Sequence, residues 1–370
     1  MGVYGQPDSW EEKMKIKTVK ARAGSMKPKP TDESKLGFGS IFTDHMFTMK
    51  YKQGEGWHDP VIGPYEAIPL DPAAMCLHYG QEIFEGLKAY RGRDGSVYLF
   101  RPLENIRRMN ASALRLCMPE LDEDTALEAV KKLVLLEKEW IPRGIGTSMY
   151  IRPTMIATEP ALGVRPSAEY LFYIIVGPVG AYYPQGFSPT KIFVTKEFVR
   201  AVRGGIGSCK AAANYASSLL ASKTAGQMGY TQVLWLDAIE LKNVEEVGTS
   251  NIFFSFGEEL VTPPLSGSIL PGVTRDSVIQ IARKNGLRVT ERSISISEII
   301  DASTSGNLKE AFASGTAAIV SPVGQIYFEG KEYLINGGKT GPITEKLYYE
   351  ILNIQYGETD DPFGWRIKLD

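Results

Sequence analysis

The chain has 370 residues, of which 43% are hydrophobic and 23% charged, and its formal net charge at pH 7 is −2. This length predicts two or three domains with full hydrophobic cores, and the composition is that of an ordinary globular protein. The charge balance disfavours a nucleic-acid partner, because phosphate binding needs a concentrated basic face. No run reaches the roughly 18 apolar residues of a membrane span and no charged-then-apolar signal begins the chain, so we expect a cytoplasmic protein.

The cysteines and histidines do not follow a metal-binding or triad pattern. The cysteines are odd in number and lack CxxC spacing, which disfavours both a disulfide framework and a zinc site. So few histidines give little support to a His-based metal site or a Ser-His-Asp triad. We therefore expect no metal, and a catalyst built from this chain would borrow its chemistry from a cofactor. The residues are Cys76, Cys117, Cys209, His45, His58 and His78.

The chain begins with an arm, residues 1–36, that lacks sustained hydrophobic periodicity and is expected to be only partly ordered. A small N-terminal α/β domain is predicted over residues 37–176. Apolar residues at helical spacing predict a helix over 105–117, and Asp124 or Thr125 can cap a second helix. Strands are expected at 42–51, 65–70, 96–100, 147–156 and 170–176.

Residues 177–189 combine glycine, alanine, proline and tyrosine between strands, which is typical of an interdomain linker. The remainder, residues 190–370, is predicted to form a larger C-terminal domain. Its helices are expected at 215–228, 274–285 and 297–302, and its strands at 191–195, 232–237, 251–256 and 287–294.

Lys210 stands out because small residues surround it, in the run Gly205-Ile-Gly-Ser-Cys-Lys-Ala-Ala-Ala-Asn-Tyr. A lysine in an apolar setting without a nearby carboxylate has a lowered amine pKa, and the neutral amine can attack a carbonyl carbon. A surface lysine after a glycine turn is the alternative interpretation. The run is not a P-loop, because Cys209 precedes the lysine and Ala211 follows it.

Several separated motifs agree in order and spacing with those of one enzyme class. Together with the Lys210 run, they resemble the fold-type IV pyridoxal-phosphate enzymes, and within them the branched-chain aminotransferases of the animal-like subgroup. The resemblance extends from about Gly37 to Gly357. It implies a fold of two α/β (α+β) domains with the cofactor site at their interface, residues 190–370 binding the cofactor, and a homodimer. The motifs lie at 77–88, 100–109, 150–153, 177–184, 270–275 and 314–317.

The resemblance implies pyridoxal 5'-phosphate as cofactor, with Lys210 as the Schiff-base lysine and proton shuttle. Glu246 would pair with the pyridine nitrogen; Glu245 is the alternative, but strand neighbours point to opposite faces and the motif selects Glu246. Tyr215 would bond the O3′ oxygen, and Arg108 would clamp the phosphate bidentately. Further cofactor contacts are assigned to Thr249, to the helix-start amides of Val273 and Thr274, and to Thr316.

The resemblance also implies an apolar substrate pocket. Arg152, two residues after Tyr150 and on the same strand face, would assist the γ-carboxylate of 2-oxoglutarate. The amides of Thr316 and Ala317 would take the α-carboxylate. Tyr79 and Val164 would come from the partner subunit of a homodimer. The pocket residues are Phe38, Tyr79, Phe84, Tyr150, Val164 and Tyr182.

The implied function is the reversible, ping-pong transfer of the amino group of L-leucine, L-isoleucine or L-valine to 2-oxoglutarate. A D-amino-acid aminotransferase, an aminodeoxychorismate lyase and a non-catalytic pyridoxal-phosphate-binding protein remain as alternatives. Animal members often carry a CxxC pair after the Gly-Thr-Ala turn, where this chain has Ala318 and Ser321. We therefore expect no thiol switch at this turn.

Overall fold

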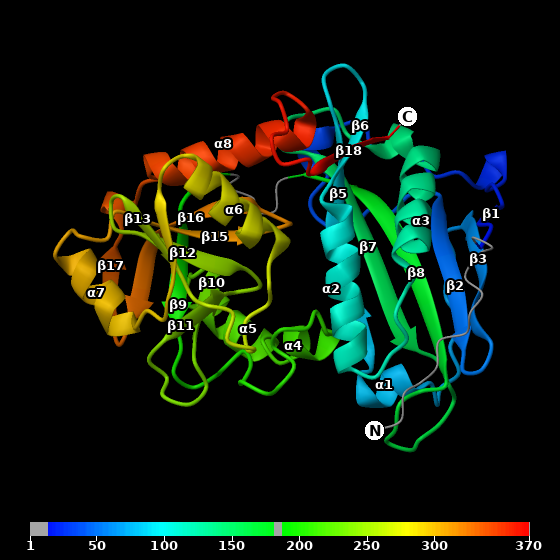
Figure 1. The fold of residues 1–370 in the computed structure, drawn as a ribbon, viewed down its shortest axis with the longest axis horizontal. Helices are drawn as coiled ribbons and strands as arrows, with labels where there is room; N and C mark the ends of the chain where they lie inside the picture. The colour runs from blue at the N-terminus through cyan, green and yellow to red at the C-terminus, as the bar shows by residue number, and fades with distance from the viewer. Residues whose placement is uncertain (1–13, 181–186, 370) are drawn as a thin grey trace.

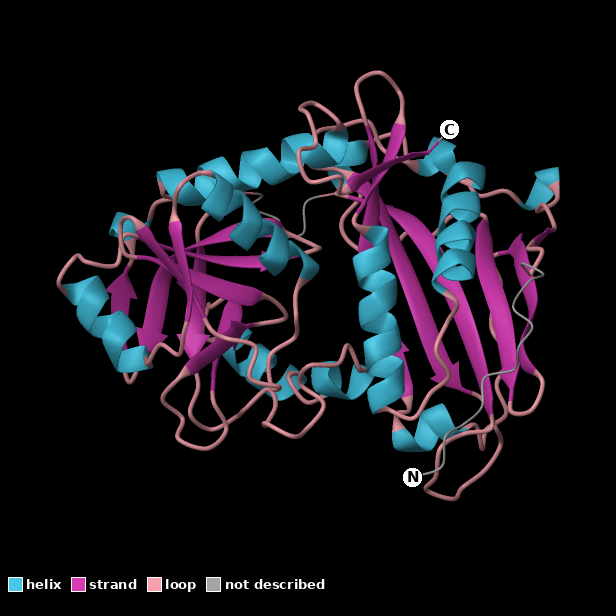
Figure 2. Ribbon diagram, viewed as in Figure 1, coloured by secondary structure: helices cyan, strands magenta, loops and turns pink. Residues whose placement is uncertain are grey.

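The computed structural model describes residues 14–180 and 187–369, which form two lobes, each built on its own nine-stranded sheet (Figure 1). Strand order in the first sheet is β1-β3-β2-β8-β7-β5-β6-β18, with β4 also on β7; the second follows β11-β10-β9-β16-β15-β12-β13-β14, with β17 also on β16. Figure 2 shows helices covering the sheets, and α2 stands on the side of the first lobe that faces the second. No helix in the described part of the chain is long and apolar enough to span a membrane.

The first lobe contains β1 (Lys17–Thr18), β2 (His45–Lys52), β3 (Gly56–Pro64), α1 (Met75–Tyr79), β4 (Glu82–Phe84), β5 (Leu87–Arg91), β6 (Val97–Phe100), α2 (Pro102–Arg115), α3 (Glu123–Leu136), β7 (Ser148–Ala157) and β8 (Glu169–Val179). Short 3-10 turns lie at Ala23–Ser25, Glu33–Lys35 and Lys138–Trp140. The core of this lobe lies between the sheet and helices α2 and α3, and includes Phe47, Leu99, Met109, Leu133 and Phe172.

The second lobe contains β9 (Thr190–Val194), α4 (Ala212–Ala216), α5 (Leu219–Gln227), β10 (Gln232–Leu236), β11 (Val244–Val247), β12 (Asn251–Ser255), β13 (Glu259–Thr262), α6 (Val273–Lys284), β14 (Arg288–Glu291), α7 (Ile296–Thr304), β15 (Glu310–Gly315), β16 (Ile319–Phe328), β17 (Lys331–Leu334) and α8 (Pro342–Tyr356). A 3-10 turn lies at Asn336–Gly338. Successive side chains of a strand face opposite ways, so Phe253 packs with α6 and α8 whereas Phe254 packs with α7. Both faces of the second sheet are therefore buried.

The strand predicted at 65–70 is wrong, because the strand at this place is β3, which ends at Pro64. The turn after β2 contains Gly54, and Gly56 begins β3; both have positive φ, and the return strand therefore starts earlier than expected. β3 then runs antiparallel to β2 until Pro64 lies opposite His45, the first residue of β2. Beyond that point β2 offers no further pairing partner.

Two helix predictions also need correction. The N-cap of α3 is Asp122 rather than Asp124 or Thr125, and its carboxylate accepts a 2.8 Å hydrogen bond from the amide of Thr125. The helix predicted at 215–228 is divided into α4 and α5. At the break, the hydroxyl of Ser218 donates to the carbonyl of Tyr215, a local bond that competes with the helix ladder.

The C-terminal end of the chain returns to the first lobe. After α8, the strand β18 (Arg366–Leu369) pairs antiparallel with β6 at the edge of the first sheet. Trp365, just before it, packs edge-on against Phe100. The predicted domain division at 1–36, 37–176, 177–189 and 190–370 stays a prediction, but the last strand belongs to the first sheet.

Candidate active site

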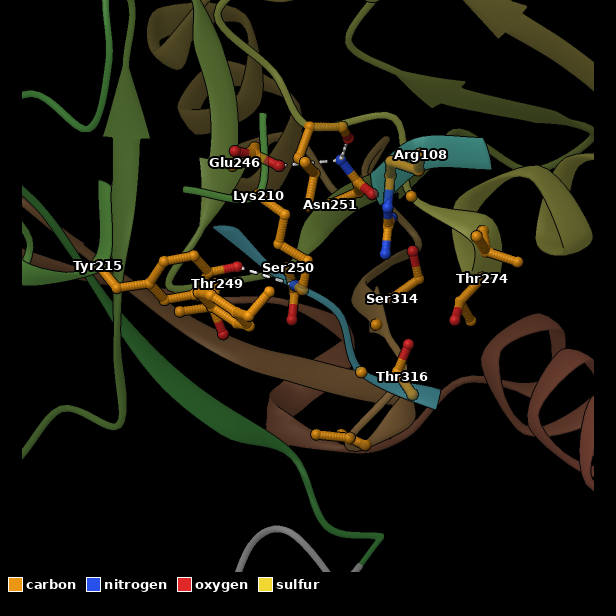
Figure 3. A pocket seen from close by; sticks show the side chains of 18 of the residues that line it. Arg108, Lys210, Tyr215, Glu246, Thr249, Ser250, Asn251, Thr274, Ser314 and Thr316 are labelled. Carbon is orange, nitrogen blue, oxygen red and sulfur yellow. Dashed lines mark hydrogen bonds between the residues drawn. The ribbon is translucent and has the colours of Figure 1, made fainter. Parts of the chain in front are cut away.

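A cavity of about 250 Å³ lies between the lobes, and residues of both line it. The first lobe contributes β4, the Gly86 connection after it, α2 and β7, and the second contributes the Lys210 run, the β11–β12 hairpin, the start of α6 and the β15–β16 turn (Figure 3). Sequence-predicted residues at this cavity are Phe38, Phe84, Arg108, Tyr150, Arg152, Lys210, Tyr215, Glu246, Thr249, Val273, Thr274, Thr316 and Ala317.

Lys210 is fixed by bonds to the first lobe. Its carbonyl accepts a 3.0 Å hydrogen bond from the amide of Phe84, and its own amide donates to the hydroxyl of Ser112, also at 3.0 Å. The Nζ atom then enters the cavity and donates to the Tyr215 hydroxyl at 2.9 Å (Figure 3). Because these bonds fix the backbone of Lys210, its amine can move only by rotation of the side chain.

The expectation of no carboxylate near Lys210 is wrong. The positive charge of Lys210 acts on Glu85 and on Glu246. It adds to the larger pull of Arg108 that lowers the pKa of Glu85, and it opposes, without overcoming, the rise that burial causes in the pKa of Glu246. Both acids are far from Lys210 in sequence, which is why the small residues around the lysine gave no sign of them. Each acid also has an arginine as its direct partner, so neither is a dedicated counter-ion of the lysine.

Glu246, on β11, is a buried carboxylate at one end of the cavity and is only 2% exposed. Its Oε1 accepts a 3.0 Å hydrogen bond from Asn251, and its Oε2 lies 2.6 Å from Nε of Arg200 in an ion pair rather than a directed hydrogen bond. Burial raises the pKa of Glu246 to about 7 even though Arg200 opposes the shift. Glu245 faces away from the cavity and accepts from Ser268.

Arg108 reaches the cavity from α2, but its bidentate edge is already occupied. Its Nε and Nη2 donate to the two carboxylate oxygens of Glu85 at 2.7 and 2.8 Å, and its Nη1 donates to the carbonyl of Pro271. Burial raises the pKa of Glu85, but the charge of Arg108 outweighs this, so the net pKa lies below its usual value. The expected bidentate clamp on a phosphate through that edge is therefore not available in this arrangement.

The first turn of α6 presents backbone amides to the cavity. Its N-cap residue is Gly272, which has no side chain to bond them, and no other side chain in the described part of the chain caps them. A Cβ on Gly272 would lie 2.1 Å from Oδ1 of Asn251, so a larger residue could not occupy this position without displacing that side chain. Uncapped amides at the positive end of a helix dipole form an anion site, here lined by Val273, Thr274 and Thr316.

The opposite part of the cavity is aromatic and carries one guanidinium. Arg152 donates to the hydroxyl of Tyr150 at 3.1 Å and lies 4.6 Å from the ring of Phe84. Its Nε is buried and has no hydrogen-bond partner in the described part of the chain. The ring of Phe38 packs edge-on against Tyr150 at 4.9 Å. This part of the cavity can hold an apolar side chain beside a cation.

Two predicted pocket residues do not line the cavity within one chain. Tyr79 is 40% exposed and Val164 is 87% exposed, and the Tyr79 hydroxyl donates to the carbonyl of Leu162 at 2.5 Å. Tyr182, the other predicted aromatic residue, lies outside the described residues. The described residues also contain no group of three or more His, Cys, Asp and Glu side chains placed to bind a metal.

Sequence reasoning missed four charged or polar residues of the site: Arg200, Glu85, Lys88 and Asn251. Lys88, on β5, is 5% exposed and donates from Nζ to the carbonyl of Ala317 at 2.7 Å. Burial lowers the pKa of Lys88 to about 7. Glu85 and Lys88 belong to the motif at 77–88, and Asn251 follows Glu246 in the same hairpin, so their motif membership was an available signal. Arg200 had no such signal.

Comparison with known proteins agrees with this geometry. Residues 82–326 match the amino-transferase class IV family. The branched-chain-amino-acid aminotransferase 2 of Bacillus subtilis is 54% identical over 93% of this chain and 94% of its own length. The solved branched-chain amino acid aminotransferase of Escherichia coli matches with a TM-score of 0.72 at 27% identity, covering 87% of this chain and 99% of that one.

A second solved structure is the T.th. branched-chain amino acid aminotransferase complexed with N-(5'-phosphopyridoxyl)-L-glutamate. It matches with a TM-score of 0.70 at 27% identity, covering 87% of this chain and 98% of that one. These matches confirm the fold class and the resemblance found in the motifs. The chain belongs to the class IV amino-transferases and, within them, to the branched-chain aminotransferases.

Proposed function

We propose that the cavity binds pyridoxal 5'-phosphate and transfers amino groups with it. The observation that carries the proposal is that the Lys210 amine, the buried Glu246 carboxylate and the uncapped start of α6 face one cavity. These groups match an aldehyde, a protonated ring nitrogen and a phosphate, respectively. Arg108, Thr249, Thr274 and Thr316 complete the proposed set of cofactor contacts, and the solved relative with a phosphopyridoxyl compound supports it.

Pyridoxal phosphate, when bound, supplies an aldehyde and a ring that accepts electrons from the substrate Cα. Lys210 would hold the aldehyde carbon of the cofactor and, once a substrate amine has released it, would move the proton of the substrate Cα. Glu246 would keep the ring nitrogen protonated, because the proton that burial favours on this carboxyl could be given to that nitrogen. The Tyr215 hydroxyl, which accepts a hydrogen bond from Lys210, would donate its own proton to the phenolic oxygen of the cofactor.

We infer that the amino donors are L-leucine, L-isoleucine and L-valine, and that 2-oxoglutarate is the acceptor. The rings of Phe38, Phe84 and Tyr150 suit a branched aliphatic chain. One methylene is worth only about 1 kcal/mol in such a pocket, so the three donors should be poorly distinguished. The positive charge of Arg152 would attract the γ-carboxylate of 2-oxoglutarate, and the Tyr150 hydroxyl, which Arg152 holds by a hydrogen bond, would assist it. The names of the relatives favour this reaction over the other class IV activities.

We also propose that two chains form a dimer and that each completes the other's pocket. Apolar side chains left exposed near α1 support this: Leu77 is 58% exposed, Leu162 67% and Val164 87%. The bond from Tyr79 to Leu162 joins α1 to the loop that carries Val164, so both would move into a partner together. Co-expressing inactive Lys210→Ala with inactive Val164→Asp should restore activity, because a mixed dimer contains one intact site. No restoration would contradict a shared site.

The purified protein should have a visible absorbance band that disappears with L-leucine and returns with 2-oxoglutarate. Lys210→Ala should lack this band and lose several orders of magnitude in turnover, because the nucleophile and the proton carrier are both removed. Lys191→Ala, which removes an exposed lysine on β9, is the matched control. Near-normal turnover of Lys210→Ala would contradict the assignment.

A further inference from the structure

Lys88 is a buried cation that joins the two lobes. It lies on β5 of the first sheet, and its bond to the carbonyl of Ala317 reaches the turn between β15 and β16 of the second. Burial is the one influence that shifts its pKa, and no carboxylate within residues 14–180 and 187–369 pairs with it. An ammonium in this setting lacks the counter-ion that a buried charge requires.

The other buried cations near the cavity differ from Lys88 in this respect. Arg108 is neutralised by Glu85, and Arg200 lies in an ion pair with Glu246. Each of these arginines therefore enters a ligand complex with its charge already balanced by the protein. Arg152 has no carboxylate partner among the described residues either, but it lies at the aromatic end beside Tyr150. Lys88 thus stands out as an unbalanced charge at the other end of the site.

The position of Lys88 identifies which part of a ligand would balance it. Lys88 lines a small side cavity together with Val273, Thr274 and Thr316. The same three residues line the main cavity, where they surround the free amides at the start of α6. Lys88 therefore lies directly behind the anion site. A charge there acts through protein rather than water, so its attraction for an anion is weakly screened.

The turn held by Lys88 is also strained. Ile319, two residues after Ala317, has a φ of 61°, in the left-handed region that a β-branched residue rarely adopts. Such a conformation persists where surrounding contacts fix it. The bond from Lys88 holds this same turn at Ala317, two residues from Ile319. A charge fixed in this way loses little entropy when the anion binds.

We propose that Lys88 is the counter-charge of the cofactor's phosphate group and acts from behind the Thr316 turn. The proposal rests on the proposed use of pyridoxal phosphate. It adds a lysine of the first lobe to the groups that balance the phosphate charge, beside Arg108, whose own charge is already paired with Glu85. Binding of the phosphate would then strengthen the link between the two lobes, because it would bind to the start of α6 in one lobe and be attracted by Lys88 in the other.

The test compares pyridoxal phosphate with pyridoxal, which has the same ring and aldehyde but no phosphate. Cofactor-stripped full-length protein is titrated with each compound by absorbance, for the wild type, Lys88→Gln and Lys88→Arg. Lys88→Gln keeps a hydrogen-bond donor for Ala317 but removes the charge, and should weaken pyridoxal phosphate about tenfold or more while changing pyridoxal less than about twofold. Lys88→Arg should retain most of the affinity, and Lys50→Gln, an exposed lysine on β2, is the control.

Equal weakening of both compounds by Lys88→Gln would make Lys88 a structural residue and overturn the proposal. Unchanged binding of both would overturn it as well. A raised KM for leucine with unchanged cofactor affinity would assign the charge to the substrate carboxylate instead. If the wild type binds neither compound, the proposed function itself fails, which is distinguishable because every variant would then also bind neither.

Discussion

The ion pair of Glu85 and Arg108 offers a sharp test of the electrostatics of the site. The two side chains are 1% and 8% exposed, and Asn105 adds a 2.9 Å hydrogen bond to Glu85. Glu85→Gln preserves the shape but leaves the Arg108 charge buried without its anion. Removing one partner of a buried pair costs about 3–5 kcal/mol, so we expect a loss of that size in the free energy of unfolding of the cofactor-free protein.

The loss should depend on pH with a definite sign. The pKa of Glu85 in the folded protein lies below its usual value of 4.5, because the pull of Arg108 exceeds the effect of burial. The pair therefore stabilises the folded state fully above pH 4.5, and this stabilisation is lost as the pH falls through the lower folded pKa. The difference between wild type and Glu85→Gln should be constant near neutral pH and shrink in acid.

Glu123→Gln is the matched control, because it breaks an ion pair at the surface. Arg107 and Glu123 are 54% and 40% exposed and lie 3.1 Å apart. Such pairs contribute about 1 kcal/mol or less. Urea unfolding followed by tryptophan fluorescence measures both variants. If Glu85→Gln loses no more than Glu123→Gln, the argument that burial makes the Arg108 pair indispensable is refuted.

Three further outcomes are expected. Glu246→Gln should flatten the pH dependence of the stability of the cofactor-free protein. The pKa of Glu246 rises from 4.5 to about 7 on folding, so between pH 4.5 and 7 the unfolded state gives up the proton first and the wild type should lose on the order of 3 kcal/mol of its free energy of unfolding. The same pH dependence in urea unfolding of both proteins would contradict this. Arg152→Ala should raise the KM for glutamate and 2-oxoglutarate at least about tenfold, since a charge-assisted bond to the γ-carboxylate is lost, but should hardly change the KM for leucine. An equal rise in KM for all three substrates would make Arg152 a scaffold residue. Mild peroxide should not cause rapid inactivation that a reductant reverses, because Ala318 and Ser321 stand where a thiol pair would be and burial raises the pKa of Cys209. If the Cys209→Ser variant is still inactivated rapidly and reversibly, the prediction is refuted.

The site residues that lie within motifs were predictable, because the residues of one motif are close together in the sequence. Lys210 and Tyr215 are five residues apart, and their side chains meet at 2.9 Å. Strand alternation allowed only one of Glu245 and Glu246 to face the cavity, and the motif selected Glu246, which is the one that lines it. Short-range geometry of this kind is encoded in spacing alone.

The charge pairing was not predictable in the same way. Arg200 and Glu246, like Glu85 and Arg108, lie on different elements, and only the packed fold brings them together. Helix α8 and the strands after residue 304 were also missed, although α8 has Pro342 in its first turn and Gly357 as a left-handed C-cap. Those end signals are present in the sequence, but they mark the ends of a helix and not the chemistry of a site.

The return of β18 to the first sheet limits how the lobes can move. The chain joins the lobes between β8 and β9 and again after α8, and the second join is fixed by the β6–β18 ladder and by Arg101, which contacts Asp276 at 2.6 Å. The Lys210 run is a further join, because Ala211 bridges to Ile83 of β4 and Cys209 belongs to the core of the first lobe. Each added join removes a direction in which one lobe could swing, so the walls of the cavity should keep their spacing when a ligand binds.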